Sequence, residues 1–251
     1  MKNPLLTAAS IFAAALVLSP VAEAADLKVI AGGSMTASMN ALGPEFEKAT
    51  GHRLVTHFDS TPNIITRVTS GTPFDMVVVP VDVFKDAAAK AHFAPGPTID
   101  IARVGYGVIV RAGAPRPDIA TPEAFKQTLL SAQSVAFLPA SAAGAYVLKT
   151  FERLGIADAM KAKTKVQSAT GEIAQAVAKG EAELGVFLTN VLIAPGVELV
   201  GPFPADLQQE LVFTAAVAAD TKEADAAKAL IAYLKTPAAA AVIKAKGMTP
   251  G

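Results

Sequence analysis

Three apolar stretches of this chain each end in a short loop that contains glycine or proline and a hydroxyl side chain. The hydroxyl residues in these loops are Ser34, Thr61 and Ser141. A helix-forming sequence follows each loop, and a helix start carries free backbone N–H groups and a partial positive charge. A hydroxyl there adds a donor, so several such starts meeting in one place would bind an anion without Lys or Arg. Taken singly, each residue is better explained as an N-cap, which stabilises a helix by ~1 kcal/mol.

The spacing of His57 and Asp59 puts both side chains on one side of a predicted strand. They are candidates for a general acid/base pair, and the alternative is a solvated pair at the rim of a site. A carboxylate ~5 Å from a dianion, at an effective dielectric of ~20, would be repelled by about 6 kcal/mol. Asp59 therefore points away from such a ligand, is protonated, or receives a hydroxyl or acid proton from it.

The composition of the 251-residue chain narrows the class of protein. Lys+Arg 22 balances Asp+Glu 22, so the basic surface typical of nucleic-acid binding is not expected. The chain has no Cys, and its three His residues match no metal-binding spacing. The glycines at positions 32, 33 and 144 allow a close backbone approach, but they form neither a P-loop nor a dinucleotide fingerprint. We expect no nucleic acid, no metal and no cofactor.

The first residues are typical of a secretory signal peptide. Lys2 precedes an apolar run at 5–18, and Ala22-Glu23-Ala24 fits a cleavage site before Ala25. An uncleaved N-terminal anchor is the alternative, although the run is short for a membrane span. We therefore predict a signal peptide over residues 1–24 and a periplasmic location.

Alternating patterns of strands and helices must position the three loops. The first part predicts a βαβαβ unit and hence a mainly parallel sheet with helices on its faces. Its elements are strands at 27–31, 53–58 and 75–79 and helices at 37–49, 63–69 and 81–91. The second part predicts strands at 104–110, 134–137, 184–188 and 209–218 and helices at 122–132, 145–154, 173–179, 220–234 and 238–246, with Thr121 as a helix cap. The pattern predicts two α/β units, with the last helices returning to the first.

These loops, in this order, resemble those of the periplasmic molybdate-binding proteins of ABC transporters. The similarity covers essentially the whole chain after residue 24. The matching segments are Val29–Met35, Phe58–Val68, Ser70–Asp75, Ala142–Tyr146, Gly180–Gly185, Tyr233–Pro237 and Lys244–Met248. The resemblance implies a type II periplasmic binding-protein fold, in which two α/β lobes are joined by two hinge strands and close on a ligand. Lobe I would comprise residues 25–103 and 219–251, and lobe II residues 104–218.

The resemblance also implies neutral donors around an oxyanion. Ser34 and Thr61 match the family's hydroxyl residues, whereas Ala143 and either Thr170 or Gly171 match its backbone donors. The expected ligand-binding set, with neighbouring residues, is Gly33, Ser34, Met35, Ser60, Thr61, Asn63, Ala143, Gly144, Thr170, Gly171, Thr189 and Asn190.

This chain departs from the family pattern at three positions. Thr61 keeps a hydroxyl but stands where the family has Ser. Leu188 stands where the family has a Tyr donor, although Thr189 and Asn190 follow directly, and Pro62 removes an N–H group. Each lost hydrogen bond to a charged ligand costs ~1.5–3 kcal/mol.

The resemblance implies a monomeric solute-binding protein that delivers a small anion to an inner-membrane ABC permease. Molybdate or tungstate is the default ligand. The alternatives are an organic carboxylate as ligand, or an isomerase similar to periplasmic aconitate isomerases, with Asp59 or His57 as the catalytic candidates.

Overall fold

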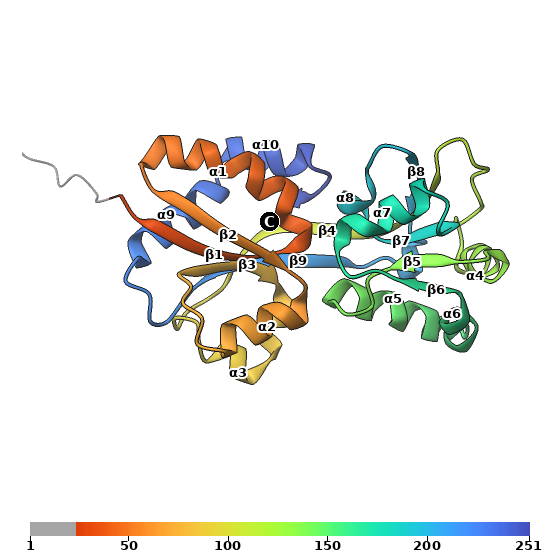
Figure 1. Cartoon of the computed structure of the whole chain (residues 1–251), viewed down its shortest axis with the longest axis horizontal. Coiled ribbons are helices and arrows are strands. Elements are labelled where there is room, and N and C mark those ends of the chain that lie inside the picture. Colours follow the sequence, from red (N-terminus) through yellow and green to blue (C-terminus); the bar gives the residue numbers. More distant parts are fainter. Residues whose placement is uncertain (1–23) are drawn as a thin grey trace, which may run out of the picture.

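The computed structural model describes residues 24–251, which form two α/β lobes joined by two long strands (Figure 1). The predicted signal peptide lies almost entirely outside the described residues. The sheet order is β2-β1-β3-β9-β4-β7-β5-β6, and β8 and β10 also pair with β4. The strands are β1 Asp26–Gly32, β2 Arg53–Asp59, β3 Met76–Pro80, β4 Ile99–Arg111, β5 Val135–Phe137, β6 Thr164–Val166, β7 Leu184–Leu188, β8 Val197–Pro202, β9 Glu210–Val217 and β10 Thr249–Pro250.

Helices cover the faces of this sheet in both lobes. Helices α1, α9 and α10 lie on one side of the first lobe, and α2 and α3 lie on the other (Figure 1). The helices are α1 Thr36–Thr50, α2 Thr61–Thr69, α3 Ala87–Lys90, α4 Pro122–Ser131, α5 Ala142–Arg153, α6 Ala157–Lys163, α7 Thr170–Ala178, α8 Thr189–Leu192, α9 Ala224–Leu234 and α10 Pro237–Ala245, with 3-10 turns η1 Gly33–Met35, η2 Val81–Lys85 and η3 Ala205–Leu207.

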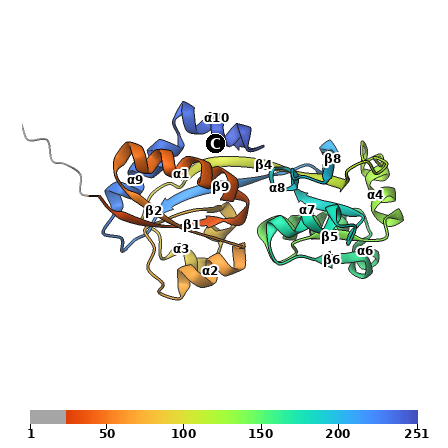
Figure 2. The ribbon, with the colours of Figure 1, turned by 45° about the horizontal axis from the view of Figure 1, so that its top comes forward.

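The long strands β4 and β9 run from one lobe to the other (Figure 2). β9 pairs antiparallel with β3 in the first lobe, and β4 pairs antiparallel with β7 in the second. The two strands also pair with each other from Ile99 to Gly105. These pairings confirm the predicted two-lobed α/β fold with two connecting strands.

Most predicted elements are present, with shifted ends. The helix predicted at 81–91 is wrong as one element, because Asp86 is extended and divides η2 from α3. The Asp86 carboxylate instead accepts a hydrogen bond from Ala89 N at 2.8 Å. Asp86 is therefore the N-cap of a new helix, α3. The elements α6, β6, α8 and β8 were not predicted, because each is short and its pattern is weak.

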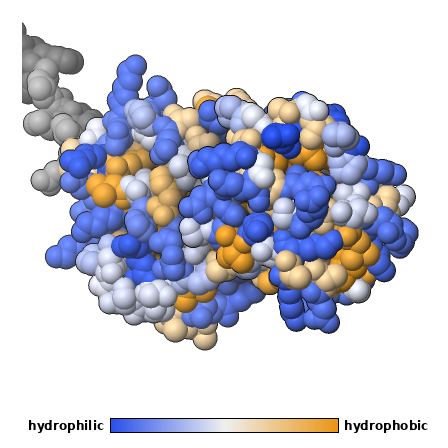
Figure 3. Space-filling model, turned by 45° about the vertical axis from the view of Figure 1, so that its right-hand side comes forward, coloured by the Kyte–Doolittle hydropathy of each residue, from blue (hydrophilic) through white to orange (hydrophobic). Residues whose placement is uncertain are grey.

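The core of each lobe is built from the buried faces of these elements. The sheet supplies fully buried residues such as Val78 and Phe187, and Phe46 and Phe151 pack onto it from helices. One face of the surface carries mostly hydrophilic residues, with hydrophobic residues in small separate groups (Figure 3). No single helix within residues 24–251 is long and apolar enough to cross a membrane, although α9 and α10 together, bent by 65°, pass the same test of length and composition.

Candidate anion-binding cavity

A cavity of about 200 Å³ lies between the two lobes, where strands end and helices begin. The first lobe contributes the ends of β1 and β2 with η1 and the start of α2. The second lobe contributes the starts of α5 and α7. The lining residues are Gly32, Gly33, Ser34, Thr36, Phe58, Asp59, Ser60, Thr61, Pro80, Leu138, Ser141, Ala143, Ser168, Ala169, Thr170, Phe187, Leu188, Leu211 and Phe213. Lys and Arg are absent from this lining, so helix starts and hydroxyls supply its positive potential.

Apart from that of Thr61, the hydroxyl groups of the lining fall into two classes, according to whether they donate a hydrogen bond within the protein. Those of Thr36, Ser141 and Ser168 donate to Gly33 O, to Leu138 O and to the Glu172 carboxylate, so their protons are committed. By contrast, the hydroxyls of Ser34, Ser60 and Thr170 make no hydrogen bond within the described part of the chain, which leaves them available to a ligand.

The N-cap assignment separates the three hydroxyl residues that the sequence singled out. Only Ser141 is a cap, since its Oγ accepts from Gly144 N at 2.9 Å at the start of α5. Ser34 lies inside η1, and Thr61 is the first residue of α2 rather than its cap. Both are nearly buried, at 6% and 9% exposure, and both line the cavity.

Thr61 also forms a direct bridge between the lobes. Its Oγ1 accepts a hydrogen bond from Ala142 N of α5 at 3.1 Å. A hydroxyl that accepts in this way keeps its own proton. The Thr61 side chain can therefore donate to a ligand while it holds the second lobe.

Backbone N–H groups at two helix starts of the second lobe complete the donor set. In the first turn of α5, Ala142 N and Gly144 N are already bonded, whereas Ala143 N remains for the cavity. At α7, the Glu172 carboxylate accepts from Ser168 N and Ala169 N, so the free donors begin at Thr170. Those hydrogen bonds lower the pKa of Glu172, Ser168 being the main contributor.

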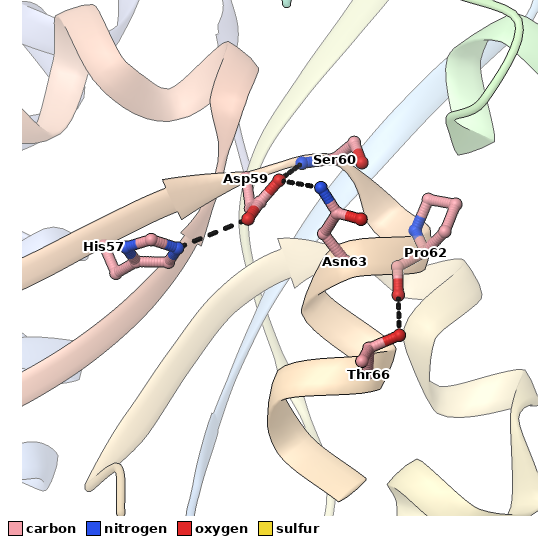
Figure 4. Close-up of polar contacts among 6 residues, drawn as sticks. All are labelled: His57, Asp59, Ser60, Pro62, Asn63 and Thr66. Carbon is pink, nitrogen blue, oxygen red and sulfur yellow. Dashed lines mark hydrogen bonds and ion pairs between the residues drawn. The ribbon is translucent and has the colours of Figure 1, made fainter. Parts of the chain in front are cut away.

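Asp59, which lines the cavity, and His57, which does not, form a cluster at the end of β2 (Figure 4). The Asp59 carboxylate accepts from Ser60 N at 2.8 Å, from Asn63 Nδ2 at 2.7 Å and from His57 Nε2 at 3.3 Å. Burial raises the pKa of Asp59, but the hydrogen bonds from Asn63, Ser60 and His57 outweigh it and hold the pKa below its usual value. In the absence of a ligand these contacts favour the ionised form of Asp59, and both carboxylate oxygens bond to its own strand and loop.

Six of the predicted ligand-binding residues lie outside the cavity lining. Met35 is fully buried in the core, and Gly144 packs so tightly that a Cβ there would lie 1.9 Å from Leu138 O. Asn63 bonds to Asp59. Thr189 Oγ1 donates to Gly105 O and Asn190 Nδ2 to Ser34 O, so neither side chain replaces the missing Tyr donor in the cavity. Gly171 follows Thr170 without lining the cavity.

The structure brings the other six together, namely Gly33, Ser34, Ser60, Thr61, Ala143 and Thr170. An apolar wall of the cavity is formed by Phe58, Phe187, Leu188, Leu211 and Phe213. Of these, only Leu188 was placed at the site from the sequence. Their strands were predicted, but nothing local indicates that these side chains meet across two lobes.

Within residues 24–251, no group of three or more His, Cys, Asp or Glu residues could hold a metal ion.

Comparison with known proteins agrees with this architecture. The family model described as bacterial extracellular solute-binding protein matches residues 27–249. The chain is 31% identical to an aconitate isomerase from Pseudomonas sp. over 99% of this chain and 97% of that protein. It is 29% identical to the molybdate-binding protein ModA of Azotobacter vinelandii over 92% of each chain.

A solved structure extends the comparison to three dimensions. The Azotobacter vinelandii periplasmic molybdate-binding protein superposes with a TM-score of 0.74 at 21% identity, over 89% of this chain and 99% of that one. The fold is therefore the type II periplasmic binding-protein fold predicted from the sequence. With the family model matching nearly the whole described chain, this protein is a member of the bacterial extracellular solute-binding protein family.

Proposed function

We propose that this protein binds a small anion in the periplasm and delivers it to an ABC permease, with a molybdate- or tungstate-like oxyanion as the default ligand. The observation that carries the proposal is the convergence of uncommitted hydroxyls and helix starts from both lobes on one cavity. Such donors stabilise an anion without a cationic side chain. The relatives named for molybdate binding support the same choice.

The proposed ligand-binding set consists of the six predicted residues at the cavity. The hydroxyls of Ser34, Ser60, Thr61 and Thr170 would donate from both lobes, together with backbone N–H groups at Gly33 and Ala143. Because these donors come from both lobes, a ligand that accepts from all of them couples binding to closure of the lobes. We propose that the lobes divide at residues 103/104 and 218/219 and that the protein acts as a monomer.

Calorimetric titration with molybdate, tungstate, sulfate, citrate and the two aconitates tests this proposal. We expect saturable binding of molybdate or tungstate. Ser34→Ala should weaken it by roughly tenfold or more, because an uncommitted donor to a charged ligand is lost. Ser38→Ala, buried in α1 but outside the cavity, is the matched control. Binding of a tricarboxylate alone would contradict the oxyanion as ligand.

An isomerase of a small tricarboxylic acid is the second candidate, favoured by the aconitate isomerase relative and by the contact of Asp59 with His57 Nε2 at 3.3 Å. The reaction needs a base that takes a proton from a carbon next to the double bond and returns it at the other end of the allylic system. A general base works best when its pKa lies near the operating pH. The lowered pKa of Asp59 makes it a weak base, and His57 lies outside the cavity lining, so binding is the better-supported function.

The two candidates are separated by following cis- and trans-aconitate with the purified protein by NMR. An isomerase would interconvert them and would lose activity in Asp59→Asn or His57→Ala. The controls are Asp225→Asn, whose side chain is fully exposed, and His92→Ala, which lies outside the cavity lining. No interconversion, with molybdate binding intact, would exclude the enzyme.

A further inference from the structure

The turn that carries Ser34 is held by a residue of the opposite lobe. Asn190, the second residue of α8, donates from Nδ2 to the main-chain oxygen of Ser34 at 2.8 Å. Because the acceptor is a carbonyl oxygen, only the NH₂ group of the amide can face it. This orients the amide and leaves its Oδ1 buried without a hydrogen-bond partner within the described residues.

Asn190 also lies close to a second part of the first lobe, at Gly247. A Cβ placed on Gly247, in the turn between α10 and β10, would lie 3.4 Å from Asn190 Cα and 3.4 Å from Ile193 Cδ1. Gly247 has φ +77°, a conformation that favours glycine. The segment from Asn190 to Ile193 therefore packs closely against the first lobe at Gly247.

Away from the connecting strands and their ends, two hydrogen bonds among residues 24–251 thus cross between the lobes, one at each of the principal hydroxyl residues of the cavity. Asn190 holds the main chain of Ser34, and Ala142 N holds the hydroxyl of Thr61. Both bonds join protein atoms, so neither requires a ligand to form. In this structure the same two bonds join the lobes and hold the Ser34 turn and the Thr61 hydroxyl.

We propose that Asn190 is a positioning residue, which holds the lobes closed and the Ser34 turn in its binding conformation through the Ser34 carbonyl. Asn190 does not touch the ligand. When a binding-competent conformation is only partly populated, the apparent dissociation constant rises in inverse proportion to its population. Loss of the Asn190 bond should therefore open the lobes before any ligand is added and weaken ligand binding as a consequence.

The absence of cysteine from the chain makes the first consequence measurable. Spin labels at Lys48→Cys in α1 and Lys149→Cys in α5, both exposed, report the distance between lobes without competing thiols. In buffer without anions that the cavity could take, Asn190→Ala should shift the distance distribution to longer values. Asn190→Asp keeps the size of the side chain, removes its donor and should cause the same shift.

The control variant is Asn40→Ala, on the exposed side of α1, which should leave the distribution unchanged. An unchanged distribution in both Asn190 variants would overturn the proposal, whatever the ligand proves to be. Titration with sodium molybdate and with cis-aconitate adds the second readout. Whichever probe binds should bind roughly threefold to tenfold more weakly to the Asn190 variants, mainly through faster dissociation. If neither probe binds the unmodified protein, the proposed function fails while the distance measurement still decides the role of Asn190.

Discussion

At the level of single residues, hydrogen-bond commitments distinguish donors of the same chemical type. Ser34 and Ser141 both line the cavity, yet Ser141 caps α5 and donates to Leu138 O, whereas Ser34 Oγ is uncommitted within residues 24–251. Asp59 is likewise committed, because three donors of its own loop and strand face its carboxylate. The ionised carboxylate still adds negative charge beside the cavity and disfavours a dianion there.

The Asp59 cluster predicts a dependence of stability on pH. A carboxyl whose pKa is lowered by folding stabilises the folded state above its unfolded pKa, ~3.9, and the contribution disappears as the pH falls through the folded value. Asp59→Asn should therefore be less stable than the unmodified protein at pH 7, and the difference should shrink below about pH 4. Urea unfolding across this range measures it. Asp225→Asn, fully exposed, should show no such trend; a constant difference for Asp59→Asn would contradict the assignment.

At the level of elements, the helix starts decide which donors reach the cavity. The start of α5 is held against the end of β5 by the tight approach of Gly144 to Leu138 and Pro139. In this position Ala143 lines the cavity, and Ala142 N donates a hydrogen bond to Thr61 Oγ1. At α7, the Glu172 carboxylate occupies the N–H groups before Thr170 and so moves the free donors into the helix.

Two glycines at these helix starts give a matched pair of variants. Gly144→Ala would place a Cβ 1.9 Å from Leu138 O, so it should lower the free energy of unfolding by about 1–3 kcal/mol or more and displace Ala143 from the cavity. Gly171→Ala meets nothing within 4 Å and should be neutral or stabilising. Chemical denaturation and anion titration of both variants measure the effects. Equal stability of the two variants would show that the start of α5 can shift without cost.

At the level of the whole molecule, the lobes share one continuous sheet. β4 pairs with β9 near the first lobe and with β7 and β8 in the second, and Thr214 Oγ1 in β9 donates to the Asp100 carboxylate in β4 at 3.0 Å. The two connecting strands thus extend the sheet β2-β1-β3 of the first lobe and the sheet β7-β5-β6 of the second. Because β4 and β9 link these sheets, we expect closure to bend the two strands while each lobe stays folded.

This shared sheet predicts a single cooperative unfolding transition. In a Tyr233→Phe variant the remaining tyrosines, Tyr106 and Tyr146, both lie in the second lobe. Their fluorescence should lose its native signal at the same urea concentration as the far-UV circular dichroism of the whole chain. Two separated midpoints would show instead that the lobes unfold independently. The unmodified protein, with Tyr233 in α9, is the control.

Much of the architecture is encoded in local sequence patterns. Apolar periodicity predicts most strands and helices, because burial of one face imposes it on each segment separately. Strand alternation likewise places His57 beside Asp59, since residues two apart in a strand share a side. The hydroxyl-bearing loops between strands and helices are visible for the same reason: turn and helix-start chemistry involves only neighbouring residues.

The composition of the cavity, in contrast, depends on contacts between segments distant in the chain. Gly33, Thr61, Ala143 and Thr170 meet only because the parallel strands of two lobes end on the same space. Asn190 donates to the carbonyl oxygen of Ser34, 156 positions earlier. Leu211 and Phe213 line the cavity from the connecting strand β9. Local sequence offers each hydroxyl as a donor. Neighbours three or four positions away accept the protons of Thr36, Ser141 and Ser168, because a hydroxyl has one proton to give. Only the tertiary structure brings the remaining hydroxyls, those of Ser34, Ser60, Thr61 and Thr170, to one cavity, because they belong to different lobes.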